Sequence, residues 1–359
     1  MSGSIKLKHA SGNGVIISAP ATNPTADRTI TLPSTDADGV LTTKDSSNSL
    51  QAVSGVNGSA FSNRNLLING AMLVWQRQVS TTTDGGYCAD RFWAAGSGLT
   101  YARSTDAPAG FKYSAKLTFN NNTLSFGQPI ELCTTGSSQP MVAGNTVTVS
   151  FYGKVDSGTE GISCDIRFRD SKFSSSNQVA FTTTDSNPTL TTSWQRFTKT
   201  FTIPAVGGTN VIAALELGGM DRTSYLTGFQ LELGSESTDF EHRSFGDELG
   251  RSQRYYTHSY NYGTYAGANT TTGAIHVMAF SGAFIRIKTP NPCYMRTNPS
   301  VSIYSTDGTA NKWRNQDTGS NINAGTTDIG QSGAGLMFLG NNEGSGQHAS
   351  CQYVLNAEF

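Results

Sequence analysis

Hydrophobic and polar residues alternate one by one through the middle of the chain, which is typical of β-strands with one face in a core and one in water. In the run 113–119, for example, Ala115 falls on one face and Lys116 on the other. The same alternation recurs at residues 147–155, 164–169, 211–217 and 229–233. Turn-forming clusters such as residues 184–188 separate these runs. So many short strands predict an all-β, jelly-roll-like sandwich over residues 61–245.

Two longer stretches frame this region. Residues 65–93 open the aromatic-rich part of the chain, and their short apolar runs on either side of Gly70 predict the opening strand of the sandwich. A second strand is expected to start at Asp90, after a polar turn that ends in glycine. Residues 226–256 are expected to be the partner of this stretch, with the closing strand of the sandwich followed by one short helix.

The helix is predicted over residues 244–256. Ser244 and Asp247 have the spacing of an N-terminal capping box, in which the serine side chain binds a backbone N–H group of the first turn. Glu248 and Arg251 can pair along one side of such a helix. We expect this helix to link the sandwich to the last part of the chain.

These two stretches also carry a resemblance to a known family. The segments NLLINGAMLVWQR, ADRFW and FQLELGSESTDFEHRSFGDELGRSQRYY resemble a carbohydrate-binding-like β-sandwich module of bacteriophage tail fibres and related virion adhesins, especially those of marine podoviruses. The resemblance extends from Asn63 to Tyr256, about half of the chain. It implies a homotrimeric virion fibre that attaches to other virion proteins through its N-terminal segment and binds host-surface glycans. The chain departs from long tail fibres because it has no heptad coiled coil and no collagen-like repeat. The fibre could therefore be mounted on the tail or on the capsid.

The N-terminal segment, residues 1–60, contains no aromatic residue and only small apolar clusters, such as Ile5 with Leu7 and the run 15–17. A monomer of this composition has too little apolar surface for a sizeable core. Two interpretations remain, a disordered linker or a thin β stalk that packs against copies of itself. Alternating pairs between turn residues favour the stalk, and the resemblance implies that this stalk anchors the protein to the virion.

The C-terminal part, residues 257–359, predicts a smaller β domain. Its expected strands lie at residues 274–280, 284–288, 300–304, 335–339 and 351–359. Residues 305–334 form a long polar stretch that we expect to be a loop, and loops of that length are usually functional or disordered. The predicted organisation is therefore a stalk, a sandwich, a linking helix and a second β domain, with boundaries at 1–60, 61–245, 246–256 and 257–359. The resemblance implies that the last of these is the receptor-binding domain.

Composition narrows the classes of function. Charged residues make up 14 % of the 359 residues and the net charge is −1, which disfavours binding to nucleic acid. No apolar run approaches the roughly 18–20 residues of a membrane span, and the N-terminus lacks the apolar core of a signal peptide. We therefore expect synthesis in a cytoplasm and no membrane insertion, and the resemblance to phage fibres implies a host cytoplasm and a final location in the virion. The five cysteines are scattered and include no CxxC motif, so neither a disulfide nor a zinc site is expected.

Candidate catalytic residues do not form a recognisable motif. The acidic residues that cluster in sequence are Glu216, Glu232, Glu236, Asp239 and Glu241. Glu232 alternates with two leucines, so it belongs to the wet face of a strand, and we expect these carboxylates to be solvated strand charges. The histidines lack metal-ligand spacing and no serine lies in a nucleophile elbow. The sequence predicts no enzyme, no cofactor and no metal, with a polysaccharide-degrading tailspike or a purely structural capsid-decorating fibre as alternatives.

Aromatic residues give the best signal for binding, because sugars stack their C–H faces on Trp and Tyr rings. Trp75 and Trp93 have apolar neighbours and are expected in the core. Trp313 lies among polar residues, which indicates an exposed ring, and binding and packing are equally compatible with it. The tyrosines at 255–265 are expected to pack between domains or subunits, with sugar binding as the alternative. The predicted ligand-binding residues are Trp313, Arg314, Tyr260 and Tyr262.

Overall fold

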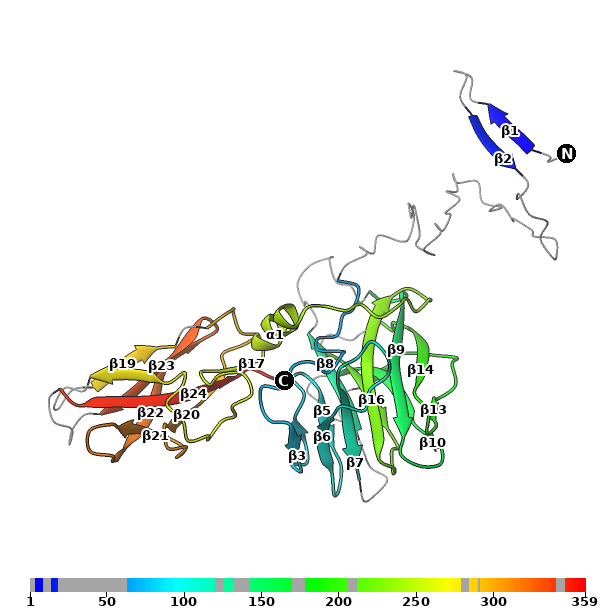
Figure 1. Cartoon of the computed structure of the whole chain (residues 1–359). Coiled ribbons are helices and arrows are strands. Elements are labelled where there is room, and N and C mark those ends of the chain that lie inside the picture. Colours follow the sequence, from blue (N-terminus) through cyan, green and yellow to red (C-terminus); the bar gives the residue numbers. More distant parts are fainter. Residues whose placement is uncertain are drawn as a thin grey trace. The chain divides into compact units, whose positions relative to one another are not determined.

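The computed structural model describes residues 4–8, 14–18, 63–119, 125–131, 142–169, 178–205, 212–278, 284–289, 291–339 and 346–359. The chain divides into two compact units, Met1–Gly58 and Ser59–Phe359. The first unit contains one antiparallel pair, β1 (Ser4–Lys8) and β2 (Gly14–Ser18), so the predicted strands at Ile5 and Val15 are confirmed (Figure 1). The remainder of the predicted stalk lies outside the described residues, and its self-association stays a prediction.

The second unit opens with a β-sandwich of two six-stranded antiparallel sheets. One sheet, which we call the front sheet, consists of β3 (Ser80–Thr81), β6 (Thr100–Ser104), β7 (Ser114–Thr118), β9 (Thr146–Val155), β14 (Gln195–Thr202) and β16 (Ser224–Leu233). Its strand order is β14-β9-β16-β7-β6-β3. Figure 1 shows its long strands β9 and β16 side by side in the sandwich.

The other sheet, the back sheet, consists of β4 (Gly86–Tyr87), β5 (Trp93–Ala95), β8 (Ser125–Glu131), β11 (Ser163–Arg169), β12 (Val179–Ala180) and β15 (Ile212–Gly218). Its order is β12-β11-β15-β8-β5-β4. A separate short pair is formed by β10 (Glu160–Gly161) and β13 (Thr189–Leu190). The predicted all-β sandwich is therefore confirmed.

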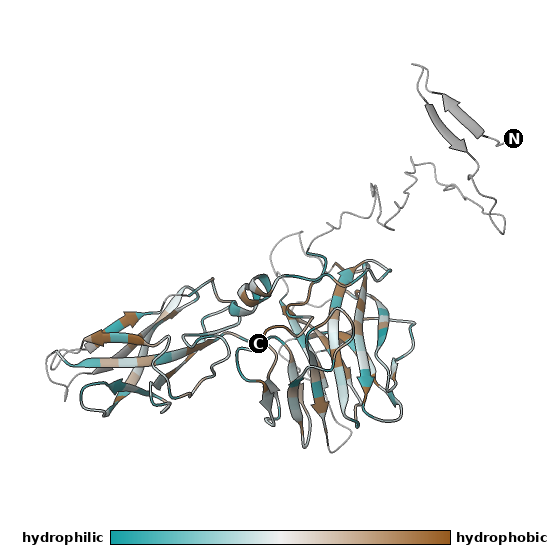
Figure 2. Ribbon diagram, viewed as in Figure 1, coloured by the Kyte–Doolittle hydropathy of each residue, from teal (hydrophilic) through white to brown (hydrophobic). Residues whose placement is uncertain are grey.

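The core between the sheets is built by the alternation that the sequence predicted. Phe151 is fully buried and its ring stacks on that of Phe229 at 5.4 Å, whereas the neighbouring Tyr152 is half-buried on the opposite face of β9. Leu117 and Ile166 fill the same core from β7 and β11. Figure 2 shows this pattern as hydrophobic and hydrophilic bands that alternate along the strands. Every second side chain of these strands is apolar and loses contact with water when the sheets meet, and this burial of apolar surface holds the two sheets together.

The predicted opening strand at residues 65–75 is wrong, although its partnership with the closing strand is confirmed. Asn69 and Met72 have φ angles of 60° and 53°, so the chain turns here instead of extending. The Asn69 side chain explains the turn, since it accepts from Val74 N and donates to the carbonyl oxygens of Val74 and Asp90. The segment nevertheless lies beside β16, where Leu66 N donates to Leu231 O at 2.8 Å.

Gly70 is required by this close approach. A Cβ atom at this position would lie 2.0 Å from the Phe229 carbonyl oxygen, and Phe229 N donates to Gly70 O at 3.0 Å. The strand expected from Asp90 starts only at Trp93, because Arg91 adopts a φ of 70° that interrupts an extended chain.

The linking helix α1 spans Phe245–Gln253, and its predicted cap is confirmed. Ser244 is the N-cap, and its hydroxyl accepts from Asp247 N at 3.1 Å. The predicted pairing of Glu248 with Arg251 is wrong. Glu248 is buried and pairs with Arg243 at 3.4 Å, while the half-buried Arg251 pairs with Asp247 one turn earlier in α1.

The C-terminal sheet consists of β17 (Tyr256–His258), β18 (Ile275–Met278), β19 (Phe284–Lys288), β20 (Ser300–Ser305), β21 (Lys312–Asn315), β22 (Asn321–Gly330), β23 (Gly333–Leu339) and β24 (His348–Asn356). The strands predicted from the sequence are confirmed within a few residues at each end. The long loop predicted at residues 305–334 is wrong, because β21 and β22 occupy much of it. No helix of the described chain is long and apolar enough to cross a membrane.

Candidate functional site

Trp313 is fully buried, so the expectation of an exposed ring is wrong. The residue lies on β21, where Trp313 and Asn315 face the C-terminal core while Lys312 and Arg314 face outward. Its charged neighbours in sequence, Lys312 and Arg314, are therefore on the other side of the strand, as the period of two requires. The ring packs with Ile303, Leu336 and other members of the C-terminal core, which leaves no free face for a sugar.

The other predicted binding residues do not gather around Trp313. Arg314 forms an ion pair with Asp307 at 2.9 Å. Tyr260 is 4 % exposed, and its hydroxyl accepts from Gly267 N. Tyr262 is 42 % exposed, but its hydroxyl accepts from Trp75 N and donates to Leu73 O in the sandwich. Each of these side chains is engaged in contacts within the fold.

The interpretation that the tyrosine cluster packs between domains is confirmed for Tyr255, Tyr256 and Tyr262. The guanidinium of Arg91 lies 3.5 Å from the ring centroid of Tyr255, and that of Arg77 lies 3.7 Å from Tyr256. Both arginines form ion pairs with Glu358, whose side chain is 4 % exposed. We call this group, Arg77, Arg91, Tyr255, Tyr256 and Glu358, the junction.

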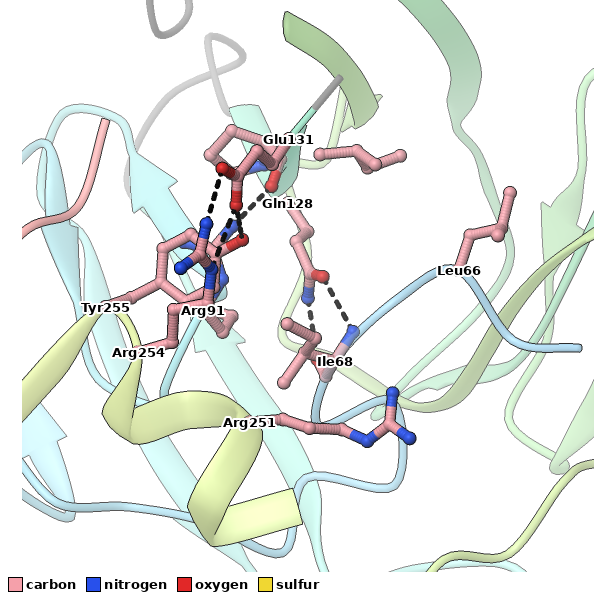
Figure 3. Close-up of a pocket in the computed structure, with 10 residues that line it drawn as sticks. Leu66, Ile68, Arg91, Gln128, Glu131, Arg251, Arg254 and Tyr255 are labelled. Carbon is pink, nitrogen blue, oxygen red and sulfur yellow. Dashed lines mark hydrogen bonds and ion pairs between the residues drawn. The ribbon is translucent and has the colours of Figure 1, made fainter. Parts of the chain in front are cut away.

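A hollow of about 500 Å³ lies beside the junction, between β8 and α1 (Figure 3). Its charged side chains already have partners among the described residues. Arg254 pairs with Glu131 at 2.7 Å, and the Tyr255 hydroxyl donates to the same carboxylate at 2.9 Å. Gln128 binds both backbone groups of Ile68, as Figure 3 shows. The hollow therefore has few polar groups free to orient a ligand.

The outer face of the front sheet presents a different arrangement. Tyr225 on β16 lies directly opposite Lys154 on β9 and Lys116 on β7, so the three side chains form one row across the sheet. Their neighbours along each strand, Leu226 among them, are buried in the core, so the row points away from it. Trp194 immediately precedes β14 and continues the row, with Lys154 Nζ 5.7 Å from its ring. We call these four residues the lysine–aromatic row.

Asp106 fixes one end of the row. Its carboxylate pairs with Lys154 Nζ at 2.5 Å and accepts from Trp194 Nε1 at 3.0 Å. The hydrogen bond from Lys154, more than that from Trp194, holds the pKa of Asp106 below its usual value. The half-buried Trp194 ring is thus held in place while part of it remains accessible.

The middle of the row is less constrained. Lys154 Nζ and Lys116 Nζ lie 5.0 Å and 5.6 Å from the Tyr225 ring, within the range of cation–π contacts. Among the described residues, neither Lys116 Nζ nor the Tyr225 hydroxyl takes part in a hydrogen bond or an ion pair, and both side chains are partly exposed. These two groups are available to a ligand.

An aromatic cluster bounds the row on one side. Phe111, from the connection between β6 and β7, packs its ring 5.3 Å from Tyr152 and 5.0 Å from Phe240 on the outer face. Gly228 allows this close packing, because a Cβ there would lie 2.8 Å from both Phe111 and Tyr152. The cluster supports the connection that carries Asp106, and so positions the carboxylate at the row.

The candidate carboxylates have structural partners. Glu216 forms two hydrogen bonds with Arg169, at 2.5 Å and 2.6 Å, and Glu232 accepts from the backbone and hydroxyl of Thr238. Glu241 accepts from Asn65 N and pairs with Arg243. The expectation of solvated carboxylates agrees with the exposure of Glu236 and Asp239. It is wrong for Glu232, which is 3 % exposed because its carboxylate accepts from Thr238 at the sheet.

The described residues also show no site for a metal ion and no reactive thiol. The described residues contain no group of three or more His, Cys, Asp or Glu side chains that could hold a metal. The described cysteines Cys88, Cys164, Cys293 and Cys351 are free, and burial raises the pKa of the Cys88 and Cys164 thiols to about 12. Cys133 lies outside the described residues.

Sequence reasoning placed Lys116 on the wet face of its strand but did not select the lysine–aromatic row. The row combines residues from β7, β9 and β16 with the start of β14, and only the strand register brings them together. One signal was available in the sequence. Trp194 sits between a Thr-Ser turn and a strand of alternating residues, where a tryptophan is not needed to fill a core.

No family model and no curated protein matches this chain. Among solved structures, the chain is similar to the enzymatically active domain of bacteriophage CBA120 tailspike protein 4, with 15 % identity and a TM-score of 0.32. That match covers 48 % of this chain, and the chain spans only 22 % of the tailspike structure.

Two carbohydrate-binding modules are also similar to the chain. The CBM22-1 xylan-binding domain of Paenibacillus barcinonensis Xyn10C matches with 16 % identity and a TM-score of 0.30, over 45 % of this chain and 99 % of that domain. A CBM4 structure matches with 18 % identity and a TM-score of 0.32, over 46 % of this chain and 98 % of its own. Likeness at this level assigns no function to the chain.

Proposed function

We propose that this protein is a non-enzymatic virion fibre that attaches to host cells by binding surface glycans on the outer face of its front sheet. The observation that carries this proposal is the lysine–aromatic row with its anchoring carboxylate Asp106. A partly exposed Trp194 ring offers a face for sugar C–H groups, and Lys116, Lys154 and Tyr225 offer donors for sugar oxygens. This combination of an aromatic ring with a few polar groups is typical of sugar sites.

The virion location, the homotrimer and the N-terminal attachment rest on the sequence resemblance between residues 63–256 and fibre modules of bacteriophages. Three copies of one weak site would engage a repetitive glycan surface together and raise the effective affinity. This proposal places the glycan site on the sandwich, whereas the sequence analysis expected it in the C-terminal domain. The burial of Trp313 is the reason for the change.

A binding role is favoured over hydrolysis by the state of the candidate carboxylates. A glycosidase needs two carboxylates on either side of one glycosidic bond. Glu216, Glu232 and Glu241 are instead bound to arginine, hydroxyl or backbone groups of the fold. Among the described residues, Asp106 is the one carboxylate that contacts the row, and it is already shared between Lys154 and Trp194.

The test is to measure how well purified protein blocks virion adsorption to host cells, with Trp194→Ala compared with Tyr294→Ala. Tyr294 is a matched control because its ring is 71 % exposed and lies in the C-terminal part of the chain. We expect that the Trp194→Ala protein no longer blocks virion adsorption, whereas the Tyr294→Ala protein still does. Light scattering of the same samples should give three times the mass of the chain.

Two results would contradict the proposal. Full blocking by a folded Trp194→Ala protein would remove the row from host binding. Release of reducing ends from host polysaccharide by the wild-type protein would show that it is an enzyme.

A further inference from the structure

We infer that the lysine–aromatic row binds an acidic glycan, with the carboxylate or sulfate group of the sugar held at Lys116 and Tyr225. This inference rests on the proposed function and specifies its ligand. It follows from the uneven pairing of the two lysines. Lys154 is neutralised by Asp106 at 2.5 Å, whereas Lys116 has no carboxylate within ion-pair distance among the described residues.

The groups around Lys116 are donors. The hydroxyl of Tyr225, directly across the strand pair, has no hydrogen-bond partner among the described residues. Thr118 lies two residues after Lys116 on the same face of β7, and its hydroxyl is 3.2 Å from that of Thr223. An ammonium group with neighbouring hydroxyl groups suits an anion, because each of them can donate to its oxygen atoms.

The charge balance of the row points the same way. Lys116, Lys154 and Asp106 together leave one positive charge, whereas on the same face Arg196 donates to Ser150 and Glu232 accepts from Thr238. The row is partly exposed, so this charge is accessible but only partly screened by water. A neutral sugar would use Trp194 equally well but would leave the Lys116 charge without a counter-ion.

Trp194 and Lys116 lie at opposite ends of the row, with Lys154 and Tyr225 between them. Neighbouring strands are about 4.8 Å apart, so the row spans three strand spacings, roughly 14 Å. This is the length of a short oligosaccharide and not of a single sugar. One residue of the glycan would therefore stack on Trp194 while the acidic group of a later residue reaches Lys116.

The experiment measures affinity by calorimetry for two matched pairs of polymers. Polygalacturonate is compared with its methyl ester, and dextran sulfate with dextran. We expect at least one charged polymer to bind at least tenfold more tightly than its neutral partner, with weaker binding as salt is raised. The first pair tests carboxylate and the second tests sulfate, so the two arms identify which acidic group the row takes.

Single substitutions test whether the preference for a charged polymer arises at the row. Lys116→Met should reduce the affinity for the charged polymer roughly tenfold, as expected for losing one charge-assisted hydrogen bond. Lys112→Met is the matched control, since Lys112 is exposed and lies 5.1 Å from the Tyr113 ring but is not part of the row. It should bind as the wild-type protein does.

Asp106→Asn gives the sharpest distinction. The asparagine keeps an acceptor for Trp194 Nε1 but releases Lys154 from its ion pair, so the row gains a positive charge. Affinity for an acidic glycan should rise severalfold, whereas a site for neutral sugars would be unchanged or weakened.

The failures of the two proposals differ. Equal affinity for charged and neutral polymers, both lost in Trp194→Ala, would overturn the acidic ligand and keep the glycan site. Binding that is unchanged in both Trp194→Ala and Lys116→Met would overturn the glycan site as well. Failure of both charged polymers to bind the wild-type protein would also overturn the acidic ligand.

Discussion

The lysine–aromatic row and the junction use the same chemical groups in opposite ways. Each places cationic side chains against aromatic rings and includes one carboxylate. In the junction, the side chains of Arg91 and Glu358 are only 1 % and 4 % exposed, and the rings of Tyr255 and Tyr256 cover the guanidinium groups. In the row, Lys154 and Asp106 are 17 % and 44 % exposed, and Lys116 has no acidic partner among the described residues.

The difference shows how burial decides the role of a charged pair. In the junction, water is excluded and the charges must satisfy each other, because an unpaired buried charge is costly. The junction therefore holds the C-terminal sheet to the sandwich. In the row, water screens each charge, so an ammonium group without a carboxylate partner costs little folding free energy and remains free to bind a ligand. Substitutions in the junction should change stability, and substitutions in the row should change binding.

Two tryptophans give the largest contrast. Trp313→Ala removes a fully buried ring from the C-terminal core and should lower the free energy of unfolding by about 3–5 kcal/mol. Trp194→Ala should change it by less than about 1 kcal/mol, because the ring is half-buried at the surface. Urea denaturation of both variants measures the difference. Similar stability for the two proteins would refute the assignment of core and surface.

The junction should be sensitive to the loss of one partner. Glu358→Gln leaves the buried Arg91 without its counter-charge and should cost about 3 kcal/mol. A double-mutant cycle with Arg91→Met would show most of that cost as coupling between the two sites. Limited proteolysis should also release the C-terminal part more readily. If Glu358→Gln melts like the wild-type protein, the junction does not hold the two parts together.

Burial beside the junction also predicts a dependence on pH. Asp90 is fully buried, and burial raises its pKa to about 6, although Arg77 and the backbone of Gln76 oppose the shift. Between its usual pKa and this value, the folded protein holds a proton that the unfolded chain has lost. Stability from Asp90 therefore rises as pH falls through this window, by up to about 1.4 kcal/mol per pH unit.

Asp90→Asn isolates this effect. The melting temperature of the wild-type protein relative to the variant should increase as pH is lowered from 7 to 4. A difference that stays constant over this range would mean that Asp90 titrates normally and that the site is open to water.

The smallest effect on stability is expected at the row. Lys154→Met breaks the partly exposed ion pair with Asp106 and should cost less than about 1 kcal/mol. Thermal melting of Lys154→Met is compared with that of Glu358→Gln, which breaks the corresponding ion pair in the junction. A cost as large as that of Glu358→Gln would show that the row is structural, and would weaken its assignment as a binding face.

Much of the fold could be predicted from the sequence, because the alternation of apolar and polar residues within each strand shows which side chains are buried. The alternation around Phe151, the strand at residues 284–288 and the Ser244 cap are local patterns, and all are confirmed. The segment at residues 65–75 could not be predicted this way. Its apolar runs look like a strand, but Asn69 binds the backbone of Val74 and turns the chain.

The candidate site was less predictable, for two physical reasons. Trp313 has charged neighbours in sequence, but on a strand these neighbours point the other way, so sequence proximity gave the wrong environment. The row brings together Lys116, Lys154, Trp194 and Tyr225, which are far apart in the chain. Their meeting depends on strand order and register, and these are set by the packing of the whole sandwich.

The most direct measurement of the central claim is quenching of tryptophan fluorescence by acrylamide with and without the charged polymer that calorimetry shows to bind, polygalacturonate or dextran sulfate. Of the four tryptophans, Trp75, Trp93 and Trp313 are 0 %, 9 % and 0 % exposed, so Trp194 should account for most of the quenching. We predict that a saturating concentration of this polymer protects the wild-type protein from quenching, and that Trp194→Phe is barely quenched in either state. Unchanged quenching of the wild-type protein, while calorimetry shows the polymer bound, would contradict the account and move the glycan away from the front sheet.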